Sequence, residues 1–396
     1  MKINRMIFIQ YVLLGINAFL ALPVILSTTK KDKSILSIAL FFAILGYFYS
    51  PPLNDLTRLM DAYEVFDAKN ISPYMLRDYF LPALFIIGHV FDLNAHFLGF
   101  TAAFILYYFL AKMAIYVLEK EQITGKSYYI YLILYFSFIP FSYYSGIRFT
   151  TALSLFLYGI FLYYYKNKKQ GYLYLALAPF AHYTLWIGVF IFLLYNLVIK
   201  KIKTKYFWML LPFLSFVIGQ FPDLFLARIL EFADSISFLA ENQINVKGYF
   251  VGHWGVAYLS NATLIGMLVY KTRIFIIISI IMLYVMYNYS SKNSLVKFTI
   301  FISSFVLLLP EFRTLFDRFS YISLFFILIT STNKSFLIQN SNKVNNIMFL
   351  FILFVAYNIF FTIKEMWSVF LSSYGEFYRI SGFNMLIDFF RGWNVY

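Results

Sequence analysis

The sequence has 396 residues, of which 62% are hydrophobic, 23% are aromatic and only 13% are charged. Soluble domains carry about 25% charged residues, so these charges are too few to coat a water-soluble globule of this length. The chain contains no cysteine, which excludes disulfides, thiolate zinc sites, iron–sulfur clusters and a thiol nucleophile. The composition predicts an all-α, polytopic integral membrane protein that forms a single transmembrane domain over residues 1–396.

The formal net charge of +14 raises the question of a nucleic-acid partner. The basic residues are scattered through short loops between apolar runs, which is the pattern of lysine and arginine gathering on the cytoplasmic side of a membrane. The expected surroundings are therefore membrane lipid, and no nucleic-acid partner is expected.

Apolar runs recur along the whole chain. The first follows Met1–Arg5 and has about 20 residues, too long for the apolar region of a signal peptide and suited to a membrane span. The expected spans are Met6–Thr28, Ile35–Tyr49, Ala95–Leu118, Tyr128–Tyr144, Ile147–Tyr165, Tyr206–Phe221, Ile274–Tyr289, Leu295–Leu309, Phe319–Thr330 and Ile347–Ile363. With the shorter stretches Phe80–Phe91, Tyr172–Ile199 and Val256–Tyr270, about 11–13 membrane helices are expected, some of them short or broken.

Charge predicts which side of the membrane the loops occupy. The strongest basic clusters should face the cytoplasm; they are Lys30–Lys33, Lys166–Lys169 and Lys200–Lys205. The two longest loops, at about 50–80 and 222–253, are net acidic and should lie outside.

This topology requires a break in Tyr172–Ile199, because the segment leaves and re-enters the same side with too few residues for two spans. Proline removes a backbone donor and disfavours helix before it, so the break is expected at Pro179–Ala181, beside His182. Phe80–Phe91 is also too short to cross, and should lie in the interface or dip inward. Irregular backbone at membrane depth lines a cavity or is buried in protein, which points to a site in the outer half.

The membrane topology of the last third of the chain is predicted from fewer charged residues. If Lys292, Lys297, Lys334 and Lys343 are cytoplasmic, Arg313 and Arg318 lie outside, and Val256–Tyr270 is a separate partial span.

Arg148 and His182 are the first pair of candidate catalytic residues. Arg148 precedes Lys166 by 18 residues and His182 precedes Lys200 by 18 residues, so both should lie at the outer end of the hydrocarbon. Charged residues there are costly and often functional. The structural alternatives are an arginine that snorkels to the interface and a histidine that caps the break.

Arg313 and Arg318 form the second group. Two guanidinium forks suit bidentate binding of phosphate or pyrophosphate oxygens, with Arg318 the stronger catalytic candidate and Arg313 a substrate-binding one. Glu311 and Asp317 lie alongside, so a solvated turn with internal ion pairs is the alternative.

The first outer loop contains Asp55, Arg58 and Asp61 at three-residue spacing, so on a helix they would share one face. Asp55 is a candidate general base on a sugar hydroxyl, and Arg58 and Asp61 are candidate substrate-binding residues, as are Tyr144 and His253. A self-paired surface helix is the alternative.

The sequence contains no P-loop, no dinucleotide fingerprint and no HExxH motif, and the histidines at positions 89, 96, 182 and 253 are not spaced as metal ligands. We expect neither a metal nor a cofactor. An enzyme of this kind would receive its driving force within a lipid-borne activated substrate, whereas a transporter would use a gradient or act passively.

The order of these parts resembles the bacterial O-antigen polymerase (Wzy) and EpsG-like exopolysaccharide polymerase family. The matching stretches are Asn54-Asp55-Leu-Thr-Arg58-Leu, Gly146-Ile-Arg148-Phe-Thr-Thr-Ala-Leu, Leu175-Ala-Leu-Ala-Pro-Phe-Ala-His182-Tyr-Thr and Arg318-Phe-Ser-Tyr321. The family's usual Gly-Asp-Tyr in the first loop is replaced here by Asn54-Asp55-Leu.

The resemblance implies a metal-independent glycosyltransferase of the inner membrane with its active site facing the periplasm. A glycan on undecaprenyl pyrophosphate would pass to the non-reducing end of a lipid-linked repeat unit, with a chain-length regulator as a further partner. Arg148 and Arg318, assisted by Arg313, would hold the pyrophosphate, and His182 or Asp55 would take the acceptor proton.

Two other functions remain open. A lipid-linked oligosaccharide flippase would share the many spans, but is expected to show two similar halves, and the sequence shows no internal repeat. Another polyprenyl-lipid-dependent glycosyltransferase or an O-antigen ligase would differ in its product.

Overall fold

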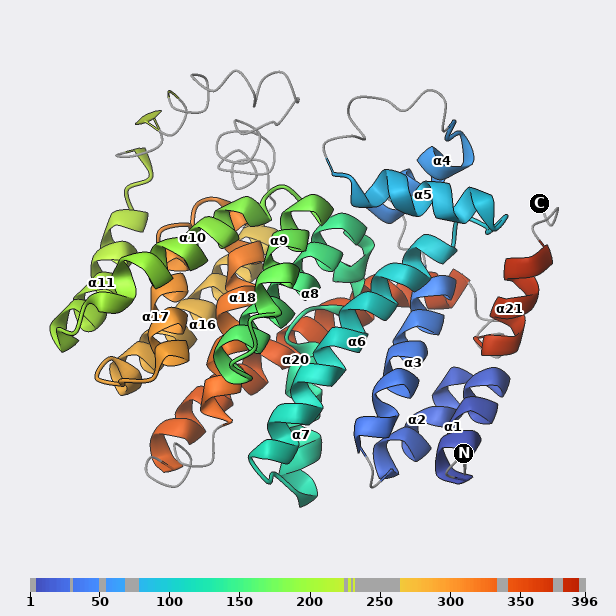
Figure 1. Ribbon diagram of the computed structural model, residues 1–396, viewed down its shortest axis with the longest axis horizontal. Helices are drawn as coiled ribbons and strands as arrows, with labels where there is room; N and C mark the ends of the chain where they lie inside the picture. Colours follow the sequence, from blue (N-terminus) through green and yellow to red (C-terminus); the bar gives the residue numbers. More distant parts are fainter. Residues whose placement is uncertain are drawn as a thin grey trace. The chain divides into compact units, whose positions relative to one another are not determined.

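The computed structural model describes residues 5–28, 31–49, 55–67, 78–223, 227–228, 231, 264–332, 341–372 and 380–391. Every regular element among them is helical, which confirms the predicted fold class (Figure 1). Five helices are long and apolar enough to cross a membrane, and seven shorter apolar helices accompany them within the described ranges. The chain is a polytopic membrane protein.

The described chain divides into two compact units. The first comprises residues 1–163, 168–185 and 358–396, and the second comprises residues 164–167 and 186–357. The sequence predicted a single transmembrane domain, and that stays a prediction.

The core of the first unit is the packing of α3 (Ile35–Phe48) on α6 (Phe97–Lys120). A Cβ on Gly46 would lie 2.7 Å from the carbonyl oxygen of Gly99, and a Cβ on Gly99 would lie 2.3 Å from that of Gly46. The two backbones therefore touch at a point that only glycine allows. Beside it, the rings of Phe42 and Tyr107 stack with their centroids 3.6 Å apart.

The first apolar run is two helices, so the prediction of a single span over Met6–Thr28 is wrong. α1 (Arg5–Ile16) and α2 (Ala18–Ser27) pack against each other and are separated by Asn17. Asn17 has an extended backbone, and its side chain accepts the N–H of Phe19 at 2.9 Å. An asparagine cap of this kind starts a new helix. The C-terminal helix α21 (Gly382–Arg391) also packs on α1.

Two short helices lie at the C-terminal end of α3. α4 (Asp55–Glu64) packs through Leu56, Leu59 and Tyr63 and leaves Asp55, Arg58 and Asp61 exposed, so the surface helix considered for these three residues is confirmed. α5 (Phe80–Val90) spans about 16 Å at 1.5 Å per residue, too little to cross a bilayer, and Figure 1 shows it lying across the end of α6.

The remaining helices of the first unit carry the candidate site. α7 (Gly125–Ser137) ends before Pro140 and is followed by the 3₁₀ turn η3 (Phe141–Ser145). α8 (Ile147–Ile160) continues into a π-helical turn, η4 (Phe161–Tyr165). α9 (Gly171–Ala181) ends at His182, so the predicted break in Tyr172–Ile199 is confirmed, one residue later than expected, with Pro179 inside the last turn of α9.

The second unit contains the helices α10 (Leu185–Leu197), α11 (Lys205–Gly219), α16 (Leu264–Asn288), α17 (Ser294–Leu307), α18 (Arg313–Ser331) and the first half of α20 (Ser341–Ser372). The boundary between the units falls after Leu185, the first residue of α10. α16 is continuous through Tyr270, so the prediction of a separate partial span ending there is wrong. α18 begins at Arg313, so both of its arginines lie in a helix and not in a turn.

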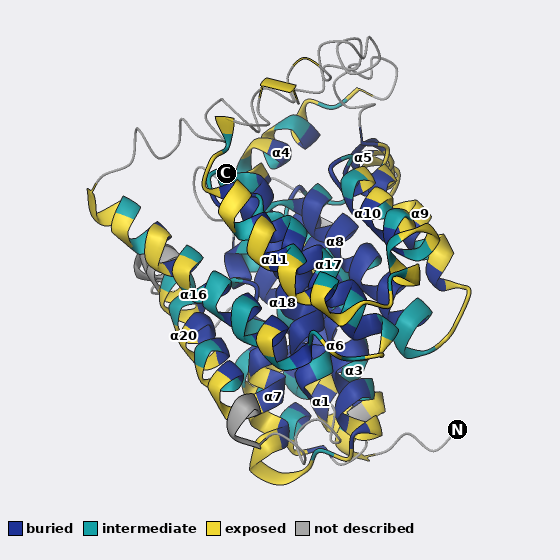
Figure 2. Cartoon of the chain, turned by 90° about the vertical axis from the view of Figure 1, so that its left-hand side faces the viewer, coloured by how far each residue is buried: buried dark blue, intermediate teal, exposed yellow. Residues whose placement is uncertain are grey.

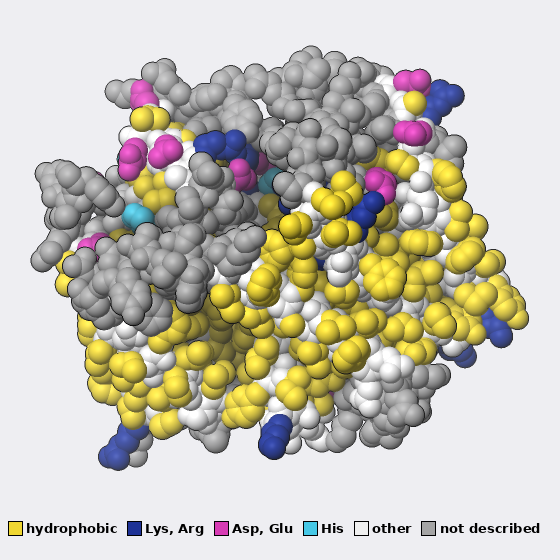
Figure 3. All heavy atoms as spheres, turned by 180° about the vertical axis from the view of Figure 1, so that it is seen from behind, with side chains coloured by type: hydrophobic (Ala, Val, Ile, Leu, Met, Phe, Trp, Pro, Cys, Tyr) yellow, Lys and Arg dark blue, Asp and Glu magenta, His cyan; other side chains and the backbone are white. Residues whose placement is uncertain are grey.

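Some helices are buried in the protein, and others carry exposed apolar side chains of the kind that face lipid. α8 and α18 are almost entirely buried, whereas α11 and α16 carry exposed large apolar residues (Figure 2). Among the described residues, Figure 3 shows a broad area of hydrophobic side chains on one face, with charged side chains above and below it. This distribution is that of a protein whose solvent is the bilayer.

Candidate functional site

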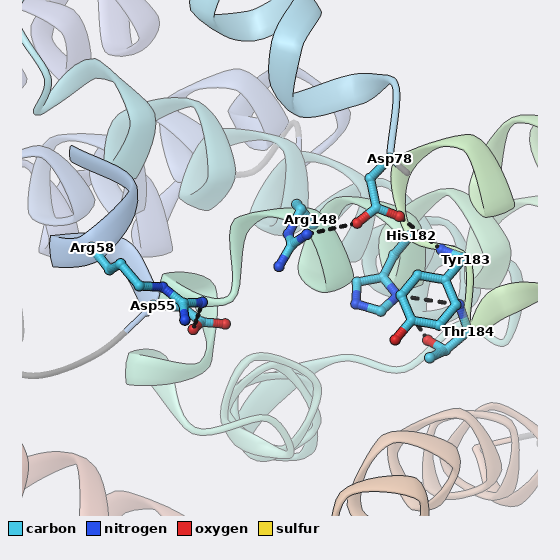
Figure 4. Close-up of polar contacts among 7 residues, drawn as sticks. All are labelled: Asp55, Arg58, Asp78, Arg148, His182, Tyr183 and Thr184. Carbon is cyan, nitrogen blue, oxygen red and sulfur yellow. Dashed lines mark hydrogen bonds and ion pairs between the residues drawn. The ribbon is translucent and has the colours of Figure 1, made fainter. Parts of the chain in front are cut away.

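A buried carboxylate joins the start of α8 to the end of α9 (Figure 4). One oxygen of Asp78 (Oδ2) accepts a hydrogen bond from Nη1 of Arg148 at 2.8 Å, and the other (Oδ1) accepts the backbone N–H of Tyr183 at 3.1 Å. The side chains of Arg148 and Asp78 are 12% and 2% exposed. Removing one partner of such a buried pair leaves a charge that is costly to keep there.

The packing of α8 on α9 places Arg148 and His182 at the same height along the two helix axes. α8 and α9 meet at Gly159 and Gly171, where a Cβ on Gly171 would lie 2.4 Å from the carbonyl oxygen of Gly159. Arg148 lies eleven residues before Gly159, and His182 lies eleven residues after Gly171. Both are therefore about 16 Å along their helix axes from the same contact. The rings of Phe149 and His182 meet edge to face at 5.7 Å, as this register requires.

His182 occupies the non-helical break itself. It caps α9 with an extended backbone (φ −157°, ψ 117°), and its ring stacks on that of Tyr183 at 4.9 Å. Its Nδ1 accepts the backbone N–H of Thr184 at 3.2 Å and lies 2.9 Å from the Thr184 hydroxyl. A neutral imidazole that accepts at Nδ1 carries its proton on Nε2, so His182 is set up to donate a hydrogen bond from Nε2.

The Asp78–Arg148–His182 cluster lies at the end of the first unit that is remote from two lysine-rich segments. α3 starts after the lysine-rich turn η1 (Lys31–Ser34), and its other end is capped by Tyr49. The carbonyl oxygen of Tyr49 accepts a hydrogen bond from the hydroxyl of Tyr144, which lies four residues before Arg148, so Arg148 is near the end of α3 that is remote from η1. The Lys166–Lys169 turn likewise follows the opposite end of α8 and η4.

The candidates on α4 sit apart from this cluster. Asp55, Arg58 and Asp61 occupy the exposed face of the helix. Arg58 donates to Asp55 at 2.8 Å, and these two side chains are 61% and 52% exposed. Figure 4 shows Arg58 directed at Asp55 and not at Arg148. This is the arrangement of the self-paired surface helix, so we leave all three residues out of the proposed site.

Tyr144 has a role within the fold. It is fully buried, and its hydroxyl donates to the carbonyl oxygens at the end of α3, those of Tyr49 and Gly46. We therefore leave Tyr144 out of the proposed site as well. His253 lies outside the described residues.

Arg313 and Arg318 belong to the second unit, in the first two turns of α18, and both are partly buried. The guanidinium of Arg313 lies over the ring of Tyr270, 5.6 Å from its centroid. Asp317, between the two arginines, accepts a hydrogen bond from Arg273 of α16 at 2.9 Å.

Sequence reasoning missed two residues, Asp78 and Arg273. Asp78 lies two residues before the short apolar run Phe80–Phe91. The signal for Asp78 was its position as a carboxylate near the start of a segment that is too short to cross the membrane. Arg273 gave no usable signal, because Lys271-Thr-Arg273 reads as a loop between two apolar runs.

Comparison with known protein families matches residues 34–374 to the EpsG family. No curated protein and no solved structure matches the chain. The matched region contains both units' arginine-bearing helices, α8 and α18, and most of the described residues. The chain therefore belongs to the EpsG family, and this membership indicates a membrane-bound polysaccharide polymerase of the glycosyltransferase type.

Proposed function

We propose that the chain lengthens an O-antigen or exopolysaccharide at the outer face of a bacterial inner membrane. It transfers a growing glycan from undecaprenyl pyrophosphate to the non-reducing hydroxyl of a lipid-linked repeat unit. The observation that carries this proposal is the buried Asp78–Arg148 pair with His182 beside it, at the end of α8 that is remote from the lysine-rich turn.

The charge distribution supports an outward-facing site. Lysine-rich segments next to membrane helices remain in the cytoplasm. Lys31–Ser34 and Lys166–Lys169 lie at the ends of α3 and α8 that are remote from Arg148. With both segments inside, the Asp78–Arg148–His182 cluster opens at the periplasmic boundary, where a flipped lipid-linked oligosaccharide presents its pyrophosphate.

Arg148 stabilises the leaving group. The glycosidic bond between the sugar's anomeric carbon and the pyrophosphate oxygen breaks, and the bonding electrons leave with undecaprenyl pyrophosphate. A guanidinium fork that binds phosphate oxygens favours this charged product. The acceptor oxygen forms the new bond to the anomeric carbon.

Asp78 takes the proton that the acceptor hydroxyl releases. In the absence of substrate its carboxylate is held by Arg148 and the N–H of Tyr183. A pyrophosphate bound to Arg148 brings negative charge beside Asp78, and a nearby like charge raises a carboxylate's affinity for a proton. The carboxylate is thus a stronger base when the donor is bound.

His182 acts as a donor in this scheme and not as the base. Its Nδ1 accepts from the backbone N–H of Thr184, so the neutral ring carries its proton on Nε2 and is a hydrogen-bond donor there. Within the second unit, Arg313 and Arg318 of α18 are a separate pair of guanidinium groups suited to phosphate oxygens.

A deletion strain tests the proposed reaction through the banding of its surface polysaccharide. A polymerase mutant keeps single capped repeat units and loses the long chains. Loss of every surface unit would instead support the flippase or ligase functions. Complementation with Arg148→Ala should leave only single units, whereas Lys126→Ala, an exposed basic residue at the start of α7, should restore the full ladder. A full ladder from a membrane-inserted Arg148→Ala variant would overturn the assignment of Arg148.

A further inference from the structure

A line of polar contacts runs between α16 and α18 in the second unit. Arg273 donates from Nη1 to Asp317 at 2.9 Å and from Nη2 to the hydroxyl of Tyr321 at 2.8 Å. Further along the same pair of helices, Thr330 donates to the hydroxyl of Tyr284 at 2.9 Å. The residue that comes later on α16 contacts the residue that comes later on α18, so the two helices run parallel.

Arg273 is an arginine inside an apolar helix. Nine residues of α16 precede it, and the stretch that follows it, Ile274–Val285, is apolar except for Ser279 and the hydroxyl of Tyr284. The side chains of Arg273 and Asp317 are only 11% and 12% exposed. A buried ion pair gains little stability over an apolar pair of similar volume, so helix packing alone does not require a charge at this position. Charged residues in membrane helices generally serve a site.

The contacts of Arg273 fix the end of α18 that carries the candidate arginines. Arg313, Asp317 and Tyr321 follow one another at four-residue spacing and so share one face of α18. On α16, Tyr270 and Arg273 are three residues apart and share the facing stripe. Tyr270 meets Arg313 while Arg273 binds both Asp317 and Tyr321. Two hydrogen bonds from one planar group set both the rotation and the height of the first turns of α18.

We propose that Arg273 is a positioning residue, which holds Arg313 and Arg318 where they meet the pyrophosphate of a lipid-linked substrate. The inference rests on the proposed function, and deepens it by assigning α16 a part in substrate binding. Arg273 acts through Asp317 and Tyr321, and it does not touch the substrate itself.

This role predicts a defect in binding more than in chemistry. When Arg273 is lost, α18 remains packed through its apolar residues, but its first turns are no longer held in one orientation. Loss of one hydrogen bond between a guanidinium and a charged phosphate oxygen weakens binding by a factor of roughly 10 to 100. The loss should appear as a KM for the lipid-linked repeat unit that is raised roughly ten- to a hundredfold, with kcat little changed.

The test uses the purified full-length protein in lipid vesicles, with lipid-linked repeat units as substrate. The double variant Arg273→Met with Asp317→Leu replaces the ion pair by apolar side chains of similar size. It should reach the wild-type amount in membranes and show the raised KM. A wild-type KM in this variant would overturn the inference.

The matched control is Tyr284→Phe. It removes a polar contact from the same interface, eleven residues after Arg273 and therefore about 16 Å along the helix, and it should leave KM unchanged. A KM raised equally in Tyr284→Phe would also overturn the inference, because any disturbance of the helix pair would then suffice.

Two single variants keep the test decisive should the double variant not accumulate. Arg273→Lys retains the charge but loses the planar fork, and Tyr321→Phe removes one acceptor. Both should raise KM, and wild-type values in both would overturn the inference. Failure of the proposed function looks different, because the wild-type protein itself would then make no polymer in the same vesicles.

Discussion

The glycine contact between α8 and α9 offers a perturbation whose size follows from the geometry. In Gly171→Ala the added Cβ would lie 2.4 Å from the carbonyl oxygen of Gly159. Carbon and carbonyl oxygen approach to about 3.3 Å at closest, so the two backbones must separate by about 1 Å. Because the oxygen belongs to a helix backbone, it cannot rotate away.

A separation of that size reaches the candidate site. The Arg148–Asp78 hydrogen bond is 2.8 Å long, and bonds of this type weaken beyond about 3.2 Å. Overpacking of this kind costs about 1–3 kcal/mol of stability, compared with a net stability of about 5–15 kcal/mol for folded proteins. A shift of about 1 Å among reacting groups can lower a rate by a factor of about 100. We therefore expect Gly171→Ala to reduce the amount of long-chain polymer more than the amount of protein in membranes.

The assay compares the polysaccharide ladder with the amount of protein in membranes for each complementing variant. Gly146→Ala is the control, because its Cβ would meet nothing closer than the carbonyl oxygen of Tyr143 at 3.6 Å, an ordinary contact. Gly171→Ala should shorten or abolish the long chains at near-normal protein level. An unchanged ladder from Gly171→Ala would refute the argument that this contact sets the level of Arg148 and His182.

Three further predictions concern individual polar groups. Asp78→Ala removes the carboxylate that holds Arg148, which should cost about 3–5 kcal/mol and lower the amount of protein in membranes. Asp78→Asn also removes the negative charge but keeps the size of the side chain and an acceptor for Tyr183, so it should accumulate better than Asp78→Ala and still make no polymer; long chains from Asp78→Asn would contradict the proton-accepting role. Arg58→Gln breaks an ion pair that is mostly exposed, so it should change stability by less than about 1 kcal/mol and leave the ladder intact; loss of long chains would return α4 to the site. Burial lowers the pKa of His96 from its ordinary 6.5, beside the carbonyl oxygen of Tyr47. The unfolded chain therefore gains a proton first, and stability should fall as pH drops below about 6.5. The thermal unfolding midpoint should decrease between pH 7.5 and 5.5 by less in His96→Gln than in the wild type, and an equal decrease would contradict this reasoning.

Much of the site's layout could be predicted because it follows from chain length and charge. Two basic clusters and a 28-residue apolar segment required a break near His182, and counting residues from each cluster brought Arg148 to the same depth. The exposed and buried faces of α4 followed from residue spacing alone, because a short surface helix depends on little else.

The features that could not be predicted depend on contacts between distant residues or on single side chains. Asp78 and Arg148 are 70 residues apart, and Arg273 and Asp317 are 44 apart, and no spacing rule connects them. Hydropathy averaged over a window also hides Asn17, whose one side-chain hydrogen bond divides the first apolar run into two helices. Arg273 lowered the local hydropathy enough to predict a loop, because its compensating partner lies on another helix.

The most direct measurement of the central claim is the reaction of the purified protein in vesicles supplied with lipid-linked repeat units alone. The wild-type protein should make glycan chains of several repeat units and release undecaprenyl pyrophosphate in proportion to the bonds formed, and Arg148→Ala should do neither. Movement of the lipid-linked unit across the bilayer without chain growth, or equal polymer from Arg148→Ala, would contradict the account.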